Sequence, residues 1–120
     1  MATSSFGQGF NCTPIQAITA FSSIINGGKL MRPYVVSQVV DNDGNIVKEN
    51  SPQVVRSVVS KETSDFVRTA MEDVFTEGTG KKAAIQGYAF GGKTGTAQQG
   101  DRSKQKYTLS FIAYHSIEDP

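Results

Sequence analysis

A lysine, two threonines and several glycines stand together in the segment Gly91-Gly92-Lys93-Thr94-Gly95-Thr96-Ala97-Gln98. A lysine ammonium flanked by hydroxyls suits a carboxylate, because all of these groups donate hydrogen bonds to an anion. Gly95 has no side chain, so a ligand can approach the backbone closely at this position. The segment predicts an anion-binding strand whose candidate site residues include Lys93, Thr94, Gly95 and Thr96.

The same glycines complete a second pattern. Residues 87–94 satisfy G-x-x-x-x-G-K-[ST], the phosphate-binding loop of nucleotide-binding proteins. That loop needs a helix directly after the lysine, because the phosphates bind to the N-terminal amides of this helix. Gly95 disfavours a helix, and no apolar stripe follows before the next strand. Nucleotide binding therefore ranks third among the interpretations.

Two helices are predicted to position the motif. The first begins at Thr13, with Pro14 in its first turn and Gln16 closing a capping box, and it ends at Gly27-Gly28. The second begins at Ser60 and ends at Gly78. Apolar residues at helical spacing predict a buried stripe on each helix. These residues are Ile15, Ile18, Phe21 and Ile25 in the first helix, and Phe66, Val67, Ala70, Met71, Val74 and Phe75 in the second.

The remaining patterns are those of strands. Residues 32–40, the turn residues Asp41 to Gly44 and residues 45–48 predict a hairpin. A turn is favoured over a calcium site, because the segment lacks the third ligand and the terminal glutamate of an EF-hand loop. The motif segment and residues 107–114 predict an antiparallel pair. The expected fold class is α+β, with antiparallel strands packed by two main helices.

Composition excludes several classes of function. The 120 residues include 12 Lys and Arg against 11 Asp and Glu, a net charge of +1 that favours no nucleic-acid partner. A single cysteine, Cys12, and a single histidine, His115, predict no metal site and no cofactor. Cys12 is expected to be a small buried residue, and His115 a packed or exposed side chain. No signal peptide or membrane span is recognisable, so we expect this sequence by itself to contain no targeting signal.

Beyond single motifs, the chain resembles the C-terminal part of the transpeptidase domain of class B penicillin-binding proteins. Four groups of residues follow one another in the family's order after the segment 3–16. They are Asn26-Gly27-Gly28-Lys29-Leu30 with Arg32-Pro33-Tyr34, Gly78-Thr79-Gly80, the segment 91–98, and Ser110-Phe111-Ile112. The resemblance implies a fragment of the serine β-lactamase and penicillin-binding transpeptidase fold.

The resemblance also implies an activity, the cross-linking of peptidoglycan stem peptides through an acyl-serine intermediate. Its partners are then the D-Ala-D-Ala terminus of a stem peptide, β-lactams, and the rest of the parent transpeptidase. By this analogy Lys93 and Thr96 are catalytic, Lys93 through its positive potential and Thr96 through a backbone N–H in the oxyanion hole. The hydroxyls of Thr94 and Thr96, together with Gly95 and Gln98, would bind the substrate.

Two of the family's three motifs are missing. The family combines Ser-x-x-Lys, Ser-x-Asn and Lys-Thr-Gly. No Ser-x-Asn occurs here, and the one Ser-x-x-Lys, Ser103 to Lys106, lies in a basic loop. We therefore expect residues 1–120 to be an incomplete C-terminal subregion that is inactive by itself. The alternative is a non-catalytic β-lactam-binding or interaction module. The resemblance implies a membrane-anchored bacterial parent with this domain outside the cytoplasm, and unpaired strand edges predict self-association of the fragment.

Overall fold

The computed structural model describes residue 7, residues 9–100, residue 103 and residues 105–115. Within them the elements are α1 (Pro14–Ile25), β1 (Lys29–Met31), β2 (Gln38–Val40), β3 (Ile46–Glu49), β4 (Val54–Ser57), α2 (Lys61–Thr76), η2 (Lys81–Ala83), β5 (Phe90–Gln98) and β6 (Tyr107–His115). The strands form two-stranded antiparallel ladders, β1 with β4, β2 with β3 and β5 with β6. The predicted α+β class is confirmed.

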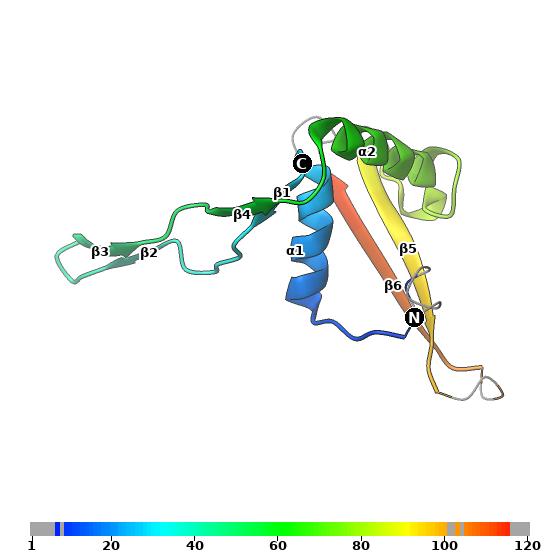
Figure 1. Ribbon diagram of the computed structural model, residues 1–120, viewed down its shortest axis with the longest axis horizontal. Helices are drawn as coiled ribbons and strands as arrows, with labels where there is room; N and C mark the ends of the chain where they lie inside the picture. Colours follow the sequence, from blue (N-terminus) through cyan, green and yellow to red (C-terminus); the bar gives the residue numbers. More distant parts are fainter. Residues whose placement is uncertain (1–6, 8, 101–102, 104, 116–120) are drawn as a thin grey trace.

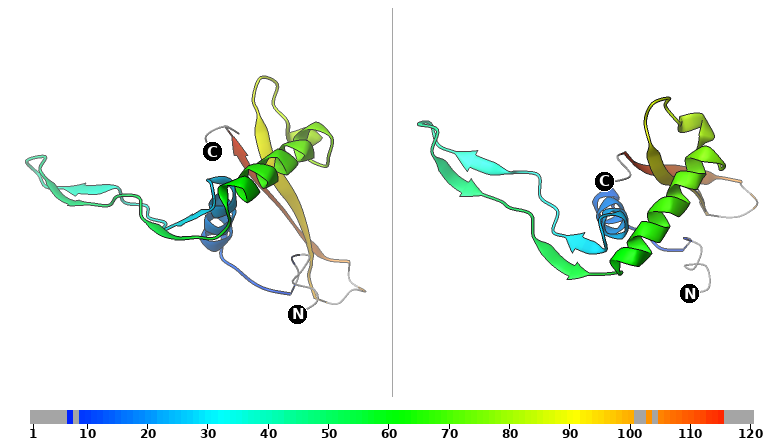
Figure 2. Two further views of the ribbon diagram at one scale, coloured as in Figure 1. Left: turned by 45° about the horizontal axis from the view of Figure 1, so that its top comes forward. Right: turned by 90° about the horizontal axis from the view of Figure 1, so that it is seen from above.

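The molecule has a body and an arm (Figure 1). The body contains α1, α2 and the β5–β6 ladder, and Figure 2 shows α2 crossing this ladder. Phe75 of α2 is 6% exposed, and its ring centroid lies 5.6 Å from those of both Phe90 and Phe111. Because aromatic rings at this separation bury much apolar area, the three rings hold α2 against one face of the ladder.

Both helices are capped as predicted. Thr13 Oγ1 accepts a hydrogen bond from Gln16 N at 3.3 Å, and Gln16 Oε1 accepts one from Thr13 N at 2.9 Å. Ser60 Oγ accepts a hydrogen bond from Thr63 N at 3.2 Å. Beyond α1, Gly27 N donates to the buried Ser64 Oγ at 3.0 Å. This last bond ties the end of α1 to the first turn of α2.

The arm contains the predicted hairpin, but its first strand begins at Gln38 and residues 32–37 are not part of a strand, contrary to the prediction. β2 and β3 pair across the turn at residues 41–44, and β1 pairs with β4 nearer the body. Asp41 Oδ1 accepts hydrogen bonds from the backbone N–H groups of Asp43 and Asn45 at 2.9 and 2.8 Å, and Asn45 Nδ2 donates to Asp41 Oδ2 at 3.0 Å. These bonds, the Asn45 side chain first, hold the pKa of Asp41 below its ordinary value. The carboxylate therefore closes a turn, as the sequence predicts.

The predicted buried stripe of α1 is wrong for its first half. Ile25 is 4% exposed, whereas Ile15 and Ile18 are 54% and 51% exposed. The reason is the position of the helix, because α1 makes its contacts with α2 and β1 near its C-terminal end. Cys12, predicted to be buried, is also exposed, since it precedes the helix on this uncovered side.

The predicted stripe of α2 is wrong at Phe66 and Ala70, which are both exposed. Phe66 stands nine positions before Phe75, about two and a half helical turns, so the two rings project from opposite sides of the helix. The covered side instead carries the fully buried Ser64 and the largely buried Arg68, three and two turns before Phe75. A polar residue therefore occupies a position that apolar periodicity assigns to the core.

The small core leads to a prediction for the isolated chain. Among the described residues, Ile25 and Phe75 are the only buried hydrophobic side chains. So little apolar burial cannot offset the conformational entropy of ordering 120 residues. We expect the isolated chain to show no cooperative thermal transition by calorimetry, and light scattering to reveal self-association through its open strand edges. A sharp transition of a monomer would contradict this expectation.

Candidate active-site strand

The motif lies inside a long, regular strand. β5 pairs with β6 in unbroken register from Phe90 opposite His115 to Gln98 opposite Tyr107. The chain continues as a strand after Lys93, with no helix at this point. A phosphate-binding loop requires that helix, so the nucleotide-binding interpretation is wrong.

Strand alternation separates the candidate side chains onto two faces. Because directly opposed residues of an antiparallel pair share a face, Thr94 lies on the same face as Phe111, which packs against α2. Thr96 and Gln98 follow at two-residue steps on this face, while Lys93 and Gly95 belong to the other. No bulge interrupts β5. The structure therefore does not bring Lys93 and both threonine hydroxyls together on one face of the strand.

The open edge of β5 brings two of the candidate groups together. Gln99 N donates to Lys106 O at 2.8 Å, which makes this opposed pair a hydrogen-bonded one. Hydrogen-bonded and non-hydrogen-bonded pairs alternate along an antiparallel ladder. Thr94 and Thr96 consequently direct their backbone N–H and C=O groups away from β6, toward an edge that is unpaired within the described residues. The Thr96 N–H is thus available to an incoming oxygen.

The side chain of Lys93 reaches the same edge because it folds back over the backbone of β5. Its Nζ donates a hydrogen bond to the carbonyl oxygen of Thr94 at 2.9 Å, and this carbonyl points to the open edge. The side chain has no carboxylate partner among the described residues. An ammonium and the backbone N–H of Thr96 therefore lie along one exposed edge, an arrangement that suits a substrate carrying an anion and developing negative charge.

A threonine that sequence reasoning did not single out supports the motif. Thr79 Oγ1 and Thr94 Oγ1 lie 3.1 Å apart and form a hydrogen bond. The turn that carries Thr79 is itself fixed, since Gly80 N donates to Val74 O at 2.8 Å. The structure therefore gives the Thr94 hydroxyl a partner within the chain and makes Thr79 a positioning residue. The segment Gly78-Thr79-Gly80 counted only toward the family resemblance in the sequence, and its contact with the motif depends on tertiary structure.

The glycines of the motif allow close packing within the ladder. A Cβ on Gly91 would meet the ring of Tyr114, and one on Gly95 would lie 2.5 Å from Ser110 Oγ. Tyr114 also donates a hydrogen bond to Arg68 O at 3.3 Å, and burial raises the pKa of its hydroxyl. The close contact with Ser110 explains why a residue without a side chain is favoured at position 95. The predicted contact of Gly95 with a substrate stays a prediction.

The remaining polar candidates lie away from this edge. His115 is exposed, and its ring lies tilted against Tyr88 and edge-on to Phe90, with ring centroids 5.3 and 5.5 Å away, in agreement with the predicted packed or exposed side chain. Ser103 and Lys106 belong to the connection between β5 and β6, while Lys104 of the same pattern lies outside the described residues. Ser103 thus lies between two strands and does not begin one of the two α-helices, in agreement with its predicted place in a loop. The described residues include no cluster of three or more His, Cys, Asp and Glu side chains suited to a metal ion.

Curated proteins similar to the chain include penicillin-binding proteins, peptidoglycan D,D-transpeptidase homologs and a sporulation protein. Stage V sporulation protein D of Bacillus subtilis is 43% identical over 99% of this chain and 19% of its own length. Penicillin-binding protein PbpB of Mycolicibacterium smegmatis is 31% identical over 95% of this chain and 19% of its own length. The FtsI homolog of Mesostigma viride is 34% identical over 99% of the chain. The chain spans about a fifth of the length of these relatives.

Solved structures give the same result. The D,D-transpeptidase domain of a peptidoglycan glycosyltransferase from Eggerthella lenta matches with a TM-score of 0.84 and 33% identity, over 93% of this chain and 26% of that one. Penicillin-binding protein A of Mycobacterium tuberculosis, solved as an imipenem acyl-enzyme, matches with a TM-score of 0.79 and 27% identity, over 91% and 24%. The predicted transpeptidase fold and relation to class B penicillin-binding proteins are confirmed. A family model described as the penicillin binding protein transpeptidase domain matches residues 1–120, and the chain belongs to this family.

Proposed function

We propose that the chain supplies the anion-binding strand of a peptidoglycan D,D-transpeptidase. The observation that carries the proposal is the open edge of β5, where the Lys93 ammonium bonds Thr94 O and the Thr96 N–H faces outward. Membership of the transpeptidase family supports it, as does the imipenem acyl-enzyme of a similar protein from M. tuberculosis. Residues 1–120 would be the C-terminal subregion of that enzyme's catalytic domain.

In the proposed reaction, a serine from elsewhere in the protein attacks the carbonyl carbon of the penultimate D-alanine in a stem peptide. Negative charge develops on the carbonyl oxygen, and the Thr96 N–H donates a hydrogen bond to it. The bond to the terminal D-alanine breaks, this alanine leaves with a proton, and the acyl-serine then reacts with an amine of a second stem. Lys93 and the Thr96 hydroxyl bind the terminal carboxylate before the bond breaks, and Gln98 contacts the peptide.

Thr94 has a narrower part in this scheme. Its hydroxyl bonds Thr79, so it holds the strand to the turn after α2. Gly95 leaves room for the Ser110 hydroxyl on the neighbouring strand β6. Both residues would then act mainly by positioning the two groups on the open edge.

The missing nucleophile gives a direct test. The isolated chain, which contains neither a helix-opening Ser-x-x-Lys nor any Ser-x-Asn, is expected to form no covalent adduct with a fluorescent penicillin. The intact protein that contains it is expected to form one adduct per molecule, as measured by intact mass. Replacing Lys93 by methionine there should slow acylation by about 10²-fold or more, because a charge-assisted bond to the anion is lost.

The outcomes separate the two candidate functions. Reversible penicillin binding by the intact protein without an adduct would identify the non-catalytic β-lactam-binding module instead. An adduct on the isolated chain would contradict the assignment of the nucleophile to another part of the protein. Within the described residues, neither helix is long and apolar enough to cross a membrane. From the family resemblance alone, the parent protein is proposed to be membrane-anchored with this domain outside the cytoplasm.

A further inference from the structure

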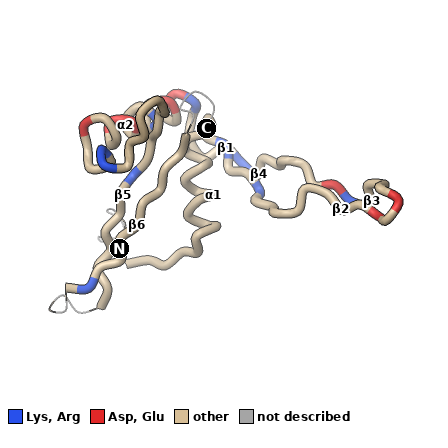
Figure 3. The backbone as a smooth tube through the Cα atoms, turned by 180° about the vertical axis from the view of Figure 1, so that it is seen from behind, with Lys and Arg blue, Asp and Glu red and all other residues tan. Residues whose placement is uncertain are grey.

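A hollow in the arm comes from an interruption in its strand pairing. The β1–β4 ladder ends with Arg32 N donating to Gln53 O at 2.9 Å, and pairing resumes where Asn50 N donates to Ser37 O at 2.7 Å. Pro33 and Pro52 lie between these bonds, and proline has no N–H with which to continue a ladder. Figure 3 shows the two runs of backbone separating between the two ladders.

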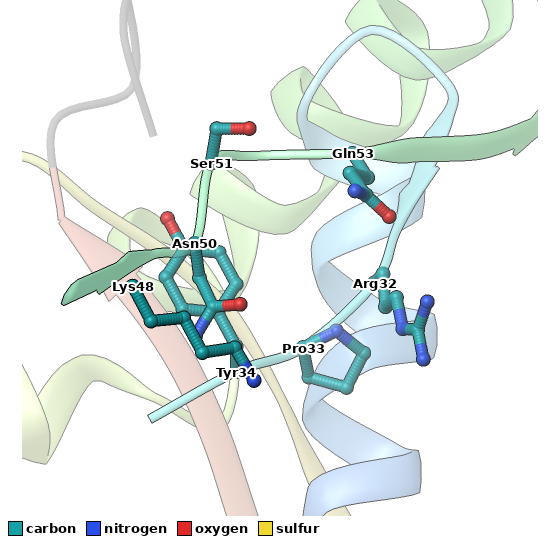
Figure 4. Close-up of a pocket in the computed structure, with 7 residues that line it drawn as sticks. All are labelled: Arg32, Pro33, Tyr34, Lys48, Asn50, Ser51 and Gln53. Carbon is teal, nitrogen blue, oxygen red and sulfur yellow. The ribbon is translucent and has the colours of Figure 1, made fainter. Parts of the chain in front are cut away.

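The opened segment forms a hollow of about 410 Å³ that is open to solvent and lined by polar and cationic side chains. Its lining residues are Arg32, Pro33, Tyr34, Lys48, Asn50, Ser51 and Gln53. Arg32 and Gln53 lie at one end, and Lys48, Asn50 and Tyr34 at the other (Figure 4). Asn50 Nδ2 donates a hydrogen bond to Val36 O at 2.7 Å, which links the two runs of backbone beside the hollow. The hollow is therefore held open by the chain itself.

The charges in the hollow are uncompensated. No Asp or Glu lines it, and neither Arg32 nor Lys48 has a side-chain hydrogen bond or ion pair within the described residues. The Tyr34 hydroxyl and the Gln53 amide likewise have no partner there. Arg32 follows β1, Lys48 belongs to β3, and a free neutral donor accompanies each cation, so the hollow is suited to a ligand that has more than one anionic group.

The lining also restricts the kind of ligand. Tyr34 and Pro33 offer flat apolar surfaces on which a sugar ring can lie, while amides and a hydroxyl suit acetamido and hydroxyl groups. A protein partner would require a larger apolar centre than these two residues provide. Free phosphate has only one anionic centre for two cations at opposite ends of the hollow. A muropeptide has sugars, acetamido groups and several carboxylates along a single chain.

We propose that the hollow between Arg32 and Lys48 is a binding site for the sugar and stem-peptide carboxylates of a peptidoglycan strand. The identity of this ligand rests on the proposed function. The arm extends from the body away from β5, so a strand held there would be tethered by a surface that the bond-forming edge does not include (Figure 1). The arm would thus raise the affinity of the protein for the peptidoglycan strand without taking part in bond formation.

The test uses the intact protein that contains this chain, first acylated by penicillin and checked by intact mass so that its reaction cleft is occupied. A fluorescent disaccharide-tetrapeptide is then titrated and followed by anisotropy. Arg32→Gln and Lys48→Gln are each expected to weaken binding about tenfold, since each removes a charge-assisted contact. Lys29→Gln, on β1 but outside the hollow, is the matched control and should bind as the unaltered protein does.

Comparison ligands distinguish the alternatives. Amidating the carboxylates of the muropeptide should weaken binding about as much as Arg32→Gln and Lys48→Gln together, and added salt should also weaken it. The proposal is overturned by a lack of saturable binding, by equal binding to all three variants, or by polyglutamate of matched charge binding as tightly, which would indicate an acidic protein partner. If penicillin forms no adduct, the proposed function fails, and the same variants then test the hollow on the unmodified protein.

Discussion

Replacing Thr96 by proline in the intact protein is expected to slow penicillin acylation by about 10²–10³-fold relative to Thr96→Ala. Proline removes the backbone N–H that faces the open edge of β5, whereas alanine keeps it and removes only the hydroxyl. The ladder itself should tolerate proline here, because this N–H is directed away from β6. Stopped-flow or gel-based acylation rates measure the difference.

Thr96→Ala is also the control for the role of the hydroxyl. It is expected to slow acylation by about 10-fold or more, through the loss of one hydrogen bond to the substrate carboxylate. Thermal unfolding of both variants verifies that the fold is retained. Equal acylation rates for the proline and alanine variants, with both proteins folded, would exclude the Thr96 N–H from the oxyanion hole.

A second large effect is expected at the junction between α1 and β1, where Gly28→Ala should destabilise the intact protein by about 2–5 kcal/mol. Gly28 has a φ of 88°, which only glycine adopts readily. A Cβ there would also run into the carbonyl oxygen of Val59 and lie 2.9 Å from its carbonyl carbon. The backbone cannot yield easily, because Val58 N donates to Gly28 O at 2.8 Å.

Gly27 provides a matched control for this prediction. Its φ of 82° is almost the same, but a Cβ on it would meet no atom within 4 Å. Gly27→Ala should therefore cost about 1–2 kcal/mol, the conformational penalty alone. Urea unfolding gives both free energies. Similar costs for the two variants would mean that a small shift of the segment between β4 and α2 relieves the contact with Val59, so that this contact does not decide stability.

Local sequence patterns predicted the elements that depend on neighbouring residues. The capping box of Thr13 and Gln16 and the turn closed by Asp41 each use partners within four positions, so their geometry follows from the sequence. The order of motifs along the chain was also sufficient for the family, which the family model confirms. The β1–β4 ladder was missed, because its strands are short and lie 23 positions or more apart.

Burial could not be inferred in the same way. Periodicity marks which residues share a side of a helix, but Phe66 and Ile15 are exposed because no described element covers their sides of α2 and α1. In contrast, Ser64 is fully buried because its hydroxyl accepts a hydrogen bond from Gly27 N, 37 positions away. Only the packing of two distant helix ends decides that a polar residue belongs in the core.

For the motif, the sequence by itself determined the chemistry: an ammonium, two hydroxyls and an open stretch of backbone suited to an anion, in a chain without its own serine motif. It also determined, through strand alternation, that Lys93 and Thr94 project to opposite faces. Tertiary structure decided which backbone groups are free, because the register with β6 leaves the N–H of Thr96 on the open edge. It also placed Thr79 against Thr94, a contact between segments that no local pattern encodes.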